Sequence, residues 1–291
     1  MKKVLLGALC LLMMASCSSL KIVDPSAAVS AGIATVQAIT ISDSQIKQLC
    51  MEYMAETDKE STIVPTSSDY HQRLTRIMGK FKGISNLDLN YKVYQSNTVN
   101  AFASGDGSVR VYTGLMDIMN DDELFAVIGH ELGHLVNKDV RDAYRAAYLV
   151  VAARYGIAAF SQTAGALSTG FLGDLGQQLA TSAYSRKQET EADEAAFQFC
   201  VSSGVDPFAM YHALNVLISV GGDTGQQGKL AEMFSSHPNT QKRATHIKEV
   251  AEAAGYNLNG TKTTGDKGTG SDNSGNTGSG NKKTIQIKPK N

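Results

Sequence analysis

The chain has 291 residues, 27 of them basic and 28 acidic, which gives a formal net charge of −1 at pH 7. The basic residues are dispersed along the chain, so neither the charge nor its distribution indicates a nucleic-acid partner. The length allows one large or two small domains, and no internal repeat divides it.

The first residues predict an export signal that ends at a cysteine. Met1-Lys2-Lys3 is a positive start, and residues 4–15 form an uncharged apolar run that is too short for a permanent transmembrane helix. Met14-Ala15-Ser16-Cys17 resembles a bacterial lipobox, with Met14 in place of the usual Leu. We therefore expect residues 1–16 to be a lipoprotein signal peptide and Cys17 to carry lipid, with an ordinary secretory signal as the alternative.

The domain organisation follows from composition. Ser18 after the cysteine favours the outer membrane by analogy with enterobacterial sorting, so we expect a cell-envelope lipoprotein that faces the periplasm. Residues 17–40 are expected to be a lipidated tether, and residues 41–256 one globular domain. Residues 257–291 are rich in Gly, Ser, Thr, Asn and Lys and are predicted to be disordered, because they bury too little apolar surface to offset their chain entropy.

The first half of the domain predicts two helices and a hairpin. Apolar periodicity indicates helices over residues 43–59 and 68–82, and the alternation of Leu89, Tyr91 and Val93 indicates a strand. Asn100-Ala101-Phe102-Ala103, the turn Gly105-Asp106-Gly107 and residues 108–112 together predict a β-hairpin.

The sequence His130-Glu131-Leu132-Gly133-His134 places two imidazoles four residues apart with a carboxylate between them. A helix repeats every 3.6 residues, so both imidazoles lie on one face and converge on one metal ion. Zinc with three protein ligands keeps a fourth position for water, and Glu131 is placed to reach that water. The alternative is a pair of histidines packed in a helical core.

The residues before this motif predict where its helix begins. Asn120 is a suitable N-cap, and Glu123 three residues later completes a variant of the capping box. An apolar stripe at helical spacing follows, formed by Leu124, Val127, Ile128, Leu132 and Leu135.

Residues 141–181 are rich in Ala, Gly and Leu, but their apolar stretch is short and contains Arg154, which argues against a transmembrane helix. We expect this region to pack into the core, and a helical hairpin over the active site or at the membrane surface is the alternative. Cys50 and Cys200 lie in apolar helical patterns, where an oxidising periplasm is compatible with a disulfide and burial with free thiols.

Residues 185–200 predict a second helix with acidic side chains near its start. Glu189 and Asp193 lie four residues apart and share a face, whereas Glu191 points to the opposite side. We select Glu189 as the third metal ligand and Asp193 as a hydrogen-bond partner that fixes the tautomer of a ligating histidine. The alternative is a solvated acidic helix face, to which we assign Glu191.

The last part of the domain carries a histidine before a proline. Pro238 favours an extended conformation at His237 and ends any helix there, and the glycines at 221, 222, 225 and 228 predict a flexible loop before it. Arg243 is expected in the following helix. Asp206-Pro207 is typical of a helix start, with Asp as N-cap and Pro at the first helical position.

HExxH at 130–134 followed by S-R-x-x-E-x-x-A-D at 185–193 resembles a family of membrane-associated zinc metallopeptidases related to the CAAX prenyl protease, HtpX and the mitochondrial inner-membrane peptidase. The resemblance covers roughly residues 97–247, and the layout is most similar to the lipid-anchored periplasmic members of the BepA and LoiP kind. It implies a gluzincin-type site in which His130, His134 and Glu189 bind one Zn²⁺ ion per chain and Glu131 is the general base.

The resemblance also implies roles for two further segments. The strand that carries Asn100, Ala101, Phe102 and Ala103 resembles the edge strand on which gluzincins bind an extended substrate by β-augmentation. Ser236-His237-Pro238 with Arg243 resembles an H-P…R element, whose histidine and arginine lie at the cleft and either block it or assist the oxyanion.

We therefore predict an α+β, mainly α, zincin-like domain with a small antiparallel sheet and an HExxH helix. The predicted function is that of a zinc metalloendopeptidase, and the resemblance implies unfolded or misassembled cell-envelope proteins as substrates. The alternative is a chaperone-like or binding lipoprotein with a non-catalytic or autoinhibited zinc site. Glu131 favours the enzyme, because a structural zinc site has no use for a general base.

Overall fold

The computed structural model describes residues 42–81, 84, 87–155, 169–222 and 227–262. The predicted signal peptide, Cys17 and the tether lie outside these residues, as does the tail from residue 263 on. Disorder was expected from residue 257, but residues 257–262 form a turn that is closed by a bridge between Tyr256 and Lys262.

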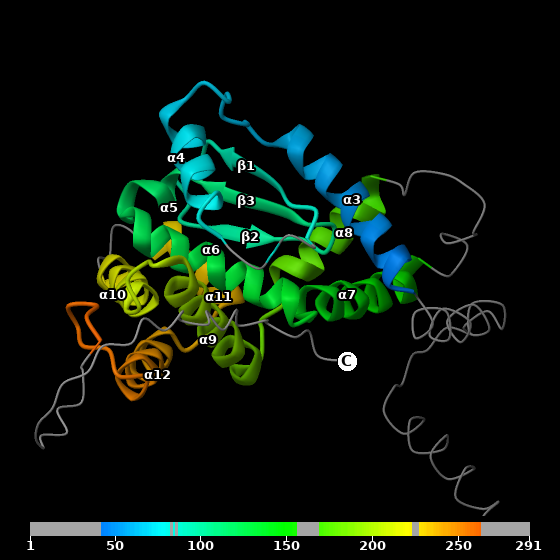
Figure 1. The fold of residues 1–291 in the computed structure, drawn as a ribbon. Coiled ribbons are helices and arrows are strands. Elements are labelled where there is room, and N and C mark those ends of the chain that lie inside the picture. Colours follow the sequence, from blue (N-terminus) through cyan, green and yellow to red (C-terminus); the bar gives the residue numbers. More distant parts are fainter. Residues whose placement is uncertain (1–41, 82–83, 85–86, 156–168, 223–226, 263–291) are drawn as a thin grey trace, which may run out of the picture.

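Helices surround a small sheet that lies along one side of the HExxH helix (Figure 1). The N-terminal helices are α3 (Asp43–Glu60) and α4 (Asp69–Met78), and the strands β1 (Asn90–Tyr94), β2 (Ala101–Ala103) and β3 (Ser108–Tyr112) follow. The later helices are α5 (Thr113–Ile118), α6 (Asp121–Val136), α7 (Asp139–Tyr155), α8 (Thr169–Ala180), α9 (Arg186–Ser203), α10 (Ala209–Gly222), α11 (Gln227–Ser236) and α12 (Thr240–Ala253). The predicted mainly helical α+β class is confirmed.

The three strands form a mixed sheet in the order β1-β3-β2, rather than the antiparallel sheet that we expected. The predicted hairpin is present, since β2 pairs antiparallel with β3, but β1 pairs parallel with the other edge of β3. The chain crosses the end of β3 between β1 and β2, and Gly114 permits the crossing: a Cβ there would lie 2.5 Å from the carbonyl oxygen of Thr98. Strand β2 therefore pairs only with β3 and is an edge strand of this sheet.

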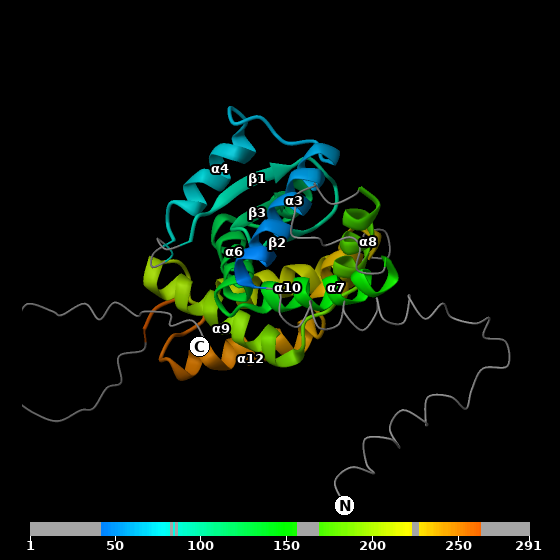
Figure 2. The same cartoon turned by 90° about the vertical axis from the view of Figure 1, so that its right-hand side faces the viewer.

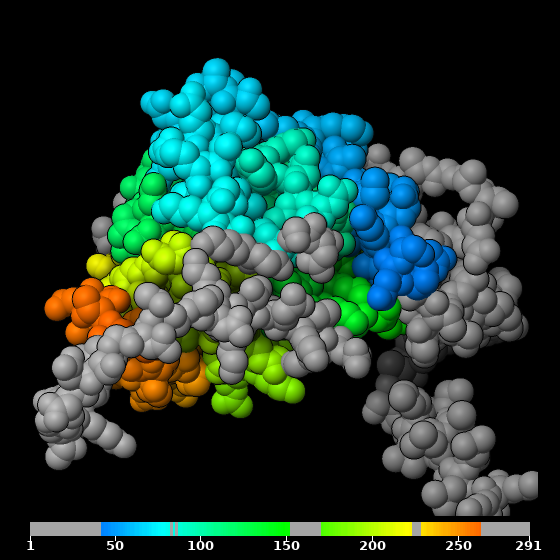
Figure 3. All heavy atoms as spheres, viewed as in Figure 1, coloured from blue at the N-terminus to red at the C-terminus, as the bar shows by residue number. Residues whose placement is uncertain are grey.

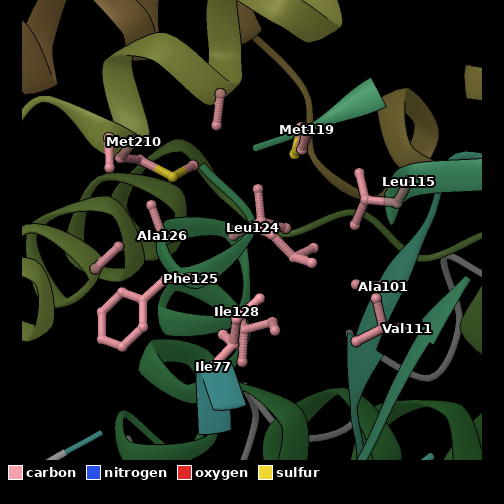
Figure 4. Close-up of a cluster of buried hydrophobic side chains, with 14 of the residues drawn as sticks. Ile77, Ala101, Val111, Leu115, Met119, Leu124, Phe125, Ala126, Ile128 and Met210 are labelled. Atoms are coloured by element: carbon pink, nitrogen blue, oxygen red, sulfur yellow. The ribbon is translucent and has the colours of Figure 1, made fainter. Parts of the chain in front are cut away.

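The main core lies between the sheet, α6 and the helices α9, α10 and α12. In Figure 4, side chains of α6 such as Leu124 and Ile128 lie between Ala101 and Val111 of the strands and Met210 of α10. Figures 1 and 2 both show α9 and α12 on the side of α6 that faces away from the sheet. The space-filling view places α4 and α12 at opposite ends of the molecule (Figure 3). The HExxH helix is therefore covered from both sides.

A second apolar cluster joins α3, α7 and α8. Its buried members include Ile46 and Leu49 of α3, Tyr144 of α7 and Phe171 of α8. The region after the HExxH helix was expected to pack into the core. Its described parts do so. No helix among the described residues is both long and apolar enough to cross a membrane.

The structure also bears on the expected glycine loop and on the two thiols. Gly221 and Gly222 end α10, Gly228 lies in a separate helix, α11, of which Leu230 and Met233 bury one face, and Gly225 lies outside the described residues. Cys50 and Cys200 are free, buried thiols in different apolar clusters.

Candidate metal centre

Helix α6 carries the HExxH residues into the interior of the domain. It begins with the predicted capping box, in which the Asn120 side chain accepts a hydrogen bond from the Glu123 N–H at 3.0 Å and the Glu123 carboxylate accepts one from the Asn120 N–H at 2.9 Å. Three polar residues of this helix, His130, Glu131 and His134, are nevertheless buried. Buried ionisable groups need partners, so their surroundings define the site.

Helix α9 faces these residues with two carboxylates one turn apart. Glu189 and Asp193 are both buried against α6. Glu191 lies on the outside of the helix, where its carboxylate is 3.9 Å from the Lys187 ammonium and its side chain is 27% exposed. The structure therefore separates the two candidate glutamates as the helical spacing predicts.

Four side chains bring one potential ligand atom each into a single cluster: His130, His134, Glu189 and His237. These atoms all lie within 4.8 Å of one another. The Nε2 atom of His130 is 3.1 Å from Nε2 of His134 and 3.2 Å from Nδ1 of His237. The Oε1 atom of Glu189 is 3.0 Å from His237 Nδ1 and 3.5 Å from His134 Nε2.

This donor set fits a zinc ion. Two ligands of a tetrahedral zinc at 2.0–2.1 Å are about 3.3 Å apart, close to the separations between these imidazole nitrogens. Imidazole nitrogens and a carboxylate oxygen are also the donors that zinc prefers. HExxH supplies two of the four donors from one helix, and α9 and the residue after α11 supply the others.

A carboxylate behind each HExxH imidazole fixes its tautomer. His130 Nδ1 lies 2.9 Å from Asp193 Oδ1, and His134 Nδ1 lies 3.0 Å from Asp139 Oδ2. Each Nδ1 donates its proton to a carboxylate, so each Nε2 presents a lone pair to the cluster. Asp139 is itself held by the Gln188 side-chain amide, which donates to Oδ1 at 3.1 Å.

Arg243 of α12 connects the carboxylates of α9. Its Nη2 and Nε donate to the two oxygens of Asp193 at 2.6 and 2.8 Å, and its Nη1 lies 2.5 Å from Oε2 of Glu189. Burial by itself raises the pKa of Asp193, but Arg243 and His130 outweigh it and hold the pKa at about 2. Asp193 is therefore ionised and ready to accept from His130 at all ordinary pH values.

Glu131 lies beside the cluster and lines a cavity of about 200 Å³. Its Oε1 has no hydrogen-bond partner among the described residues, and His237 Nε2 is 3.6 Å away. Burial raises the pKa of this carboxyl group above its ordinary value, against the opposing effect of His237 and His134. A carboxylate with a raised pKa and a free oxygen is suited to accept and return a proton.

The edge strand β2 forms one wall of the same cavity. Asn100, Ala101, Phe102 and Ala103 all line it, together with Glu131 and His237. Asn100 accepts a hydrogen bond from Tyr112 of β3, and Ser104 donates one to Ser108, so the alternate residues Ala101 and Ala103 direct their backbone groups away from β3. The segment expected to hold an extended substrate therefore lies beside the metal cluster.

Two residues of the site were not predicted from the sequence. Asp139 follows the HExxH helix by a tight turn in which Lys138 has a positive φ of 68°, and only this turn brings it back to His134. Tyr184 stacks on the His134 ring with the two centroids 3.8 Å apart and the planes 14° apart. An acidic residue five positions after the second histidine was a usable signal for Asp139, but no sequence pattern indicated Tyr184.

An HExxH helix packed against a glutamate-bearing helix, with a sheet edge along the cavity, defines a zincin-type metallopeptidase. The sequence pattern of Peptidase family M48 matches residues 66–251. Metalloproteases LoiP and YcaL of Escherichia coli (strain K12) are each 36% identical to this chain, over 80% of it and 90% of LoiP, and over 81% of it and 92% of YcaL. A protease HtpX homologue of Fusobacterium nucleatum is 29% identical over 67% of this chain and 71% of its own. The chain belongs to peptidase family M48 and is a zinc metallopeptidase, which confirms the resemblance seen in its motifs.

Asp139→Asn should weaken zinc binding about 10- to 100-fold, because the amide no longer raises the basicity of His134 as a carboxylate does. Competition with a chromogenic chelator measures this affinity. Asp142→Asn is the matched control, since Asp142 lies in the same first turn of α7 but is exposed and paired with Arg141. An equal affinity for zinc in both variants would show that Asp139 does not support the ligand.

Proposed function

We propose that this metallopeptidase is an endopeptidase that cleaves unfolded or misassembled proteins of the cell envelope. The observation that carries the proposal is the buried Glu131 carboxylate, which faces both the four-donor cluster and a cavity walled by an edge strand. A strand edge accepts a chain of any sequence through backbone hydrogen bonds, provided that the chain is extended. Extended segments are exposed in unfolded proteins, which supports them as the substrate class.

The roles of the residues follow from their positions. His130, His134 and Glu189 would hold zinc, which when bound supplies a Lewis acid for the scissile carbonyl and an acidified water. Glu131 accepts the proton of the attacking water and returns it to the leaving amine. Arg243 positions Asp193 and Glu189, since its guanidinium is engaged with both, and this favours a supporting role over direct contact with the oxyanion.

His237 occupies the fourth position in this arrangement, and we infer that it closes the resting site. Its Nδ1 is about as close to the ligand atoms of His130 and Glu189 as those two atoms are to the ligand atom of His134. A site with four protein ligands has no position for water, so cleavage requires His237 to leave. An autoinhibited site was the alternative to an enzyme in the sequence analysis. In this proposal it is the resting state of the enzyme.

The cellular location is proposed from the sequence alone. We propose that Cys17 carries lipid and anchors the protein to the outer membrane, with the peptidase domain in the periplasm. Cys17→Ala should then release the protein from the membrane fraction and prevent the incorporation of labelled palmitate. A wild-type protein that incorporates no palmitate would contradict the anchor but not the peptidase.

Glu131→Gln should reduce the cleavage of unfolded casein about 10²–10⁴-fold, because the amide keeps the size of the side chain but cannot accept a proton. Zinc content should stay at the wild-type value. Glu191→Gln makes the same chemical change on the outside of α9 and should leave cleavage unchanged. In cells, the inactive variant should retain envelope proteins that cross-linking and mass spectrometry identify, and near-normal turnover by this variant would refute the mechanism.

His237→Ala should raise the basal rate of cleavage while zinc remains bound, because three ligands are left and the fourth position opens. The increase should reach about tenfold if one molecule in ten is open in the wild type. Peptide turnover and zinc content of the same preparation measure both quantities. A lower rate with zinc retained would instead assign His237 to the oxyanion.

A further inference from the structure

Glu232 is a second carboxylate in the cavity, and neither the metal cluster nor the catalytic step uses it. It lies in α11, four residues before Ser236, and both residues line the cavity. His237 follows Glu232 by five positions, which corresponds to a rise of about 7.5 Å along a helix. An extended substrate covers a similar length with about two residues.

No cation among the described residues that line the cavity compensates for Glu232. The ionisable lining residues other than tyrosines are Glu131, Glu232 and His237, and no lysine or arginine of the described chain is among them. Glu232 is an exposed residue, but desolvation of its carboxyl group by the cavity walls raises the pKa, and a hydrogen bond with the side chain of Asn100 acts in the opposite direction. The carboxylate thus has a neutral partner, and a cation that enters the cavity would find it available.

The walls around Glu232 suit a long aliphatic side chain with a charged end. Tyr53 and Tyr112 line the cavity. Burial raises the pKa of both hydroxyl groups, and the negative charge of the nearby Glu232 raises it further. Phe102 lies beside Tyr112, with ring centroids 6.4 Å apart. Aromatic and apolar walls accommodate the methylene stem of lysine or arginine, and aromatic faces attract the charged end.

Helix α11 is held in place at both ends, so the backbone that carries Glu232 is fixed before a substrate binds. The Val99 N–H donates to the carbonyl oxygen of Lys229 at 2.9 Å, and the Tyr184 N–H donates to that of Ser236 at 3.2 Å. Between these points, Leu230 and Met233 are buried. A fixed backbone lowers the entropy that is lost when the carboxylate binds a cation.

We propose that Glu232 determines specificity by binding a lysine or arginine side chain of the substrate within two positions of the scissile bond. The inference rests on the proposed endopeptidase function, because it assigns a preference to that same cavity. It makes the basic, extended segments of unfolded proteins the preferred substrates.

Matched fluorogenic peptides test the proposal. The peptides carry lysine, arginine or the uncharged isostere norleucine at each of the two positions on either side of the cleaved bond. At one of these positions, the wild type should cleave the basic peptides with a kcat/KM about tenfold above that of the norleucine peptide, a ratio in the range of one charge-assisted contact. Glu232→Gln should abolish the ratio, and Glu232→Lys should reverse it.

Glu249→Gln is the matched control, because Glu249 is exposed on α12 and does not line the cavity; it should keep the wild-type ratio. A wild type without a preference for basic residues, or a Glu232→Gln variant that keeps the preference, would overturn the proposal. The norleucine peptide separates this failure from that of the proposed function. If the wild type cleaves it and a chelator stops the cleavage, the endopeptidase stands whatever the role of Glu232.

Discussion

The close approach of α6 and α9 is the constraint on which the site depends. Gly133, inside the HExxH motif, faces α9 so closely that a Cβ there would lie 3.0 Å from Ala195 Cβ and 3.1 Å from Ala192 Cα. A Cβ at Gly129, one turn earlier, would lie 3.4 Å from Ala196 Cα. Because these five positions carry a methyl side chain or none, the helix axes lie near enough for short side chains to meet. Only then does Glu189 reach the imidazoles of α6.

The close packing of α6 against α9 also brings several carboxyl groups together in the interior. The carboxylates of Glu131, Asp139, Glu189 and Asp193 are all buried, and Arg243 is the buried guanidinium that pairs with two of them. Four carboxyl groups and one guanidinium favour a further positive charge in this buried site, from a metal ion or from protons on the histidines. A divalent ion among the ligand atoms supplies it, and the raised pKa of Glu131 reflects the same burial. The electrostatics and the ligand geometry therefore favour the same occupant.

The sequence predicted those parts of the site that depend on local helix geometry. The HExxH pair and the choice of Glu189 over Glu191 followed from the spacing of residues on one helix, which needs no tertiary information. Asp139 and Tyr184 were missed because their positions depend on the turn at Lys138 and on the direction in which the chain enters α9. The parallel pairing of β1 was missed for a similar reason, since adjacent strands favour a meander and the chain instead crosses the end of β3. Long-range placement of this kind leaves no periodic signal.

Metal analysis of purified protein tests the central claim most directly, namely that α9 supplies the third zinc ligand through Glu189. The account predicts one zinc per chain for the wild type and for Glu191→Ala, and no zinc for Glu189→Ala at a helix content that circular dichroism shows to be native. Zinc retained by Glu189→Ala and lost by Glu191→Ala would contradict the account.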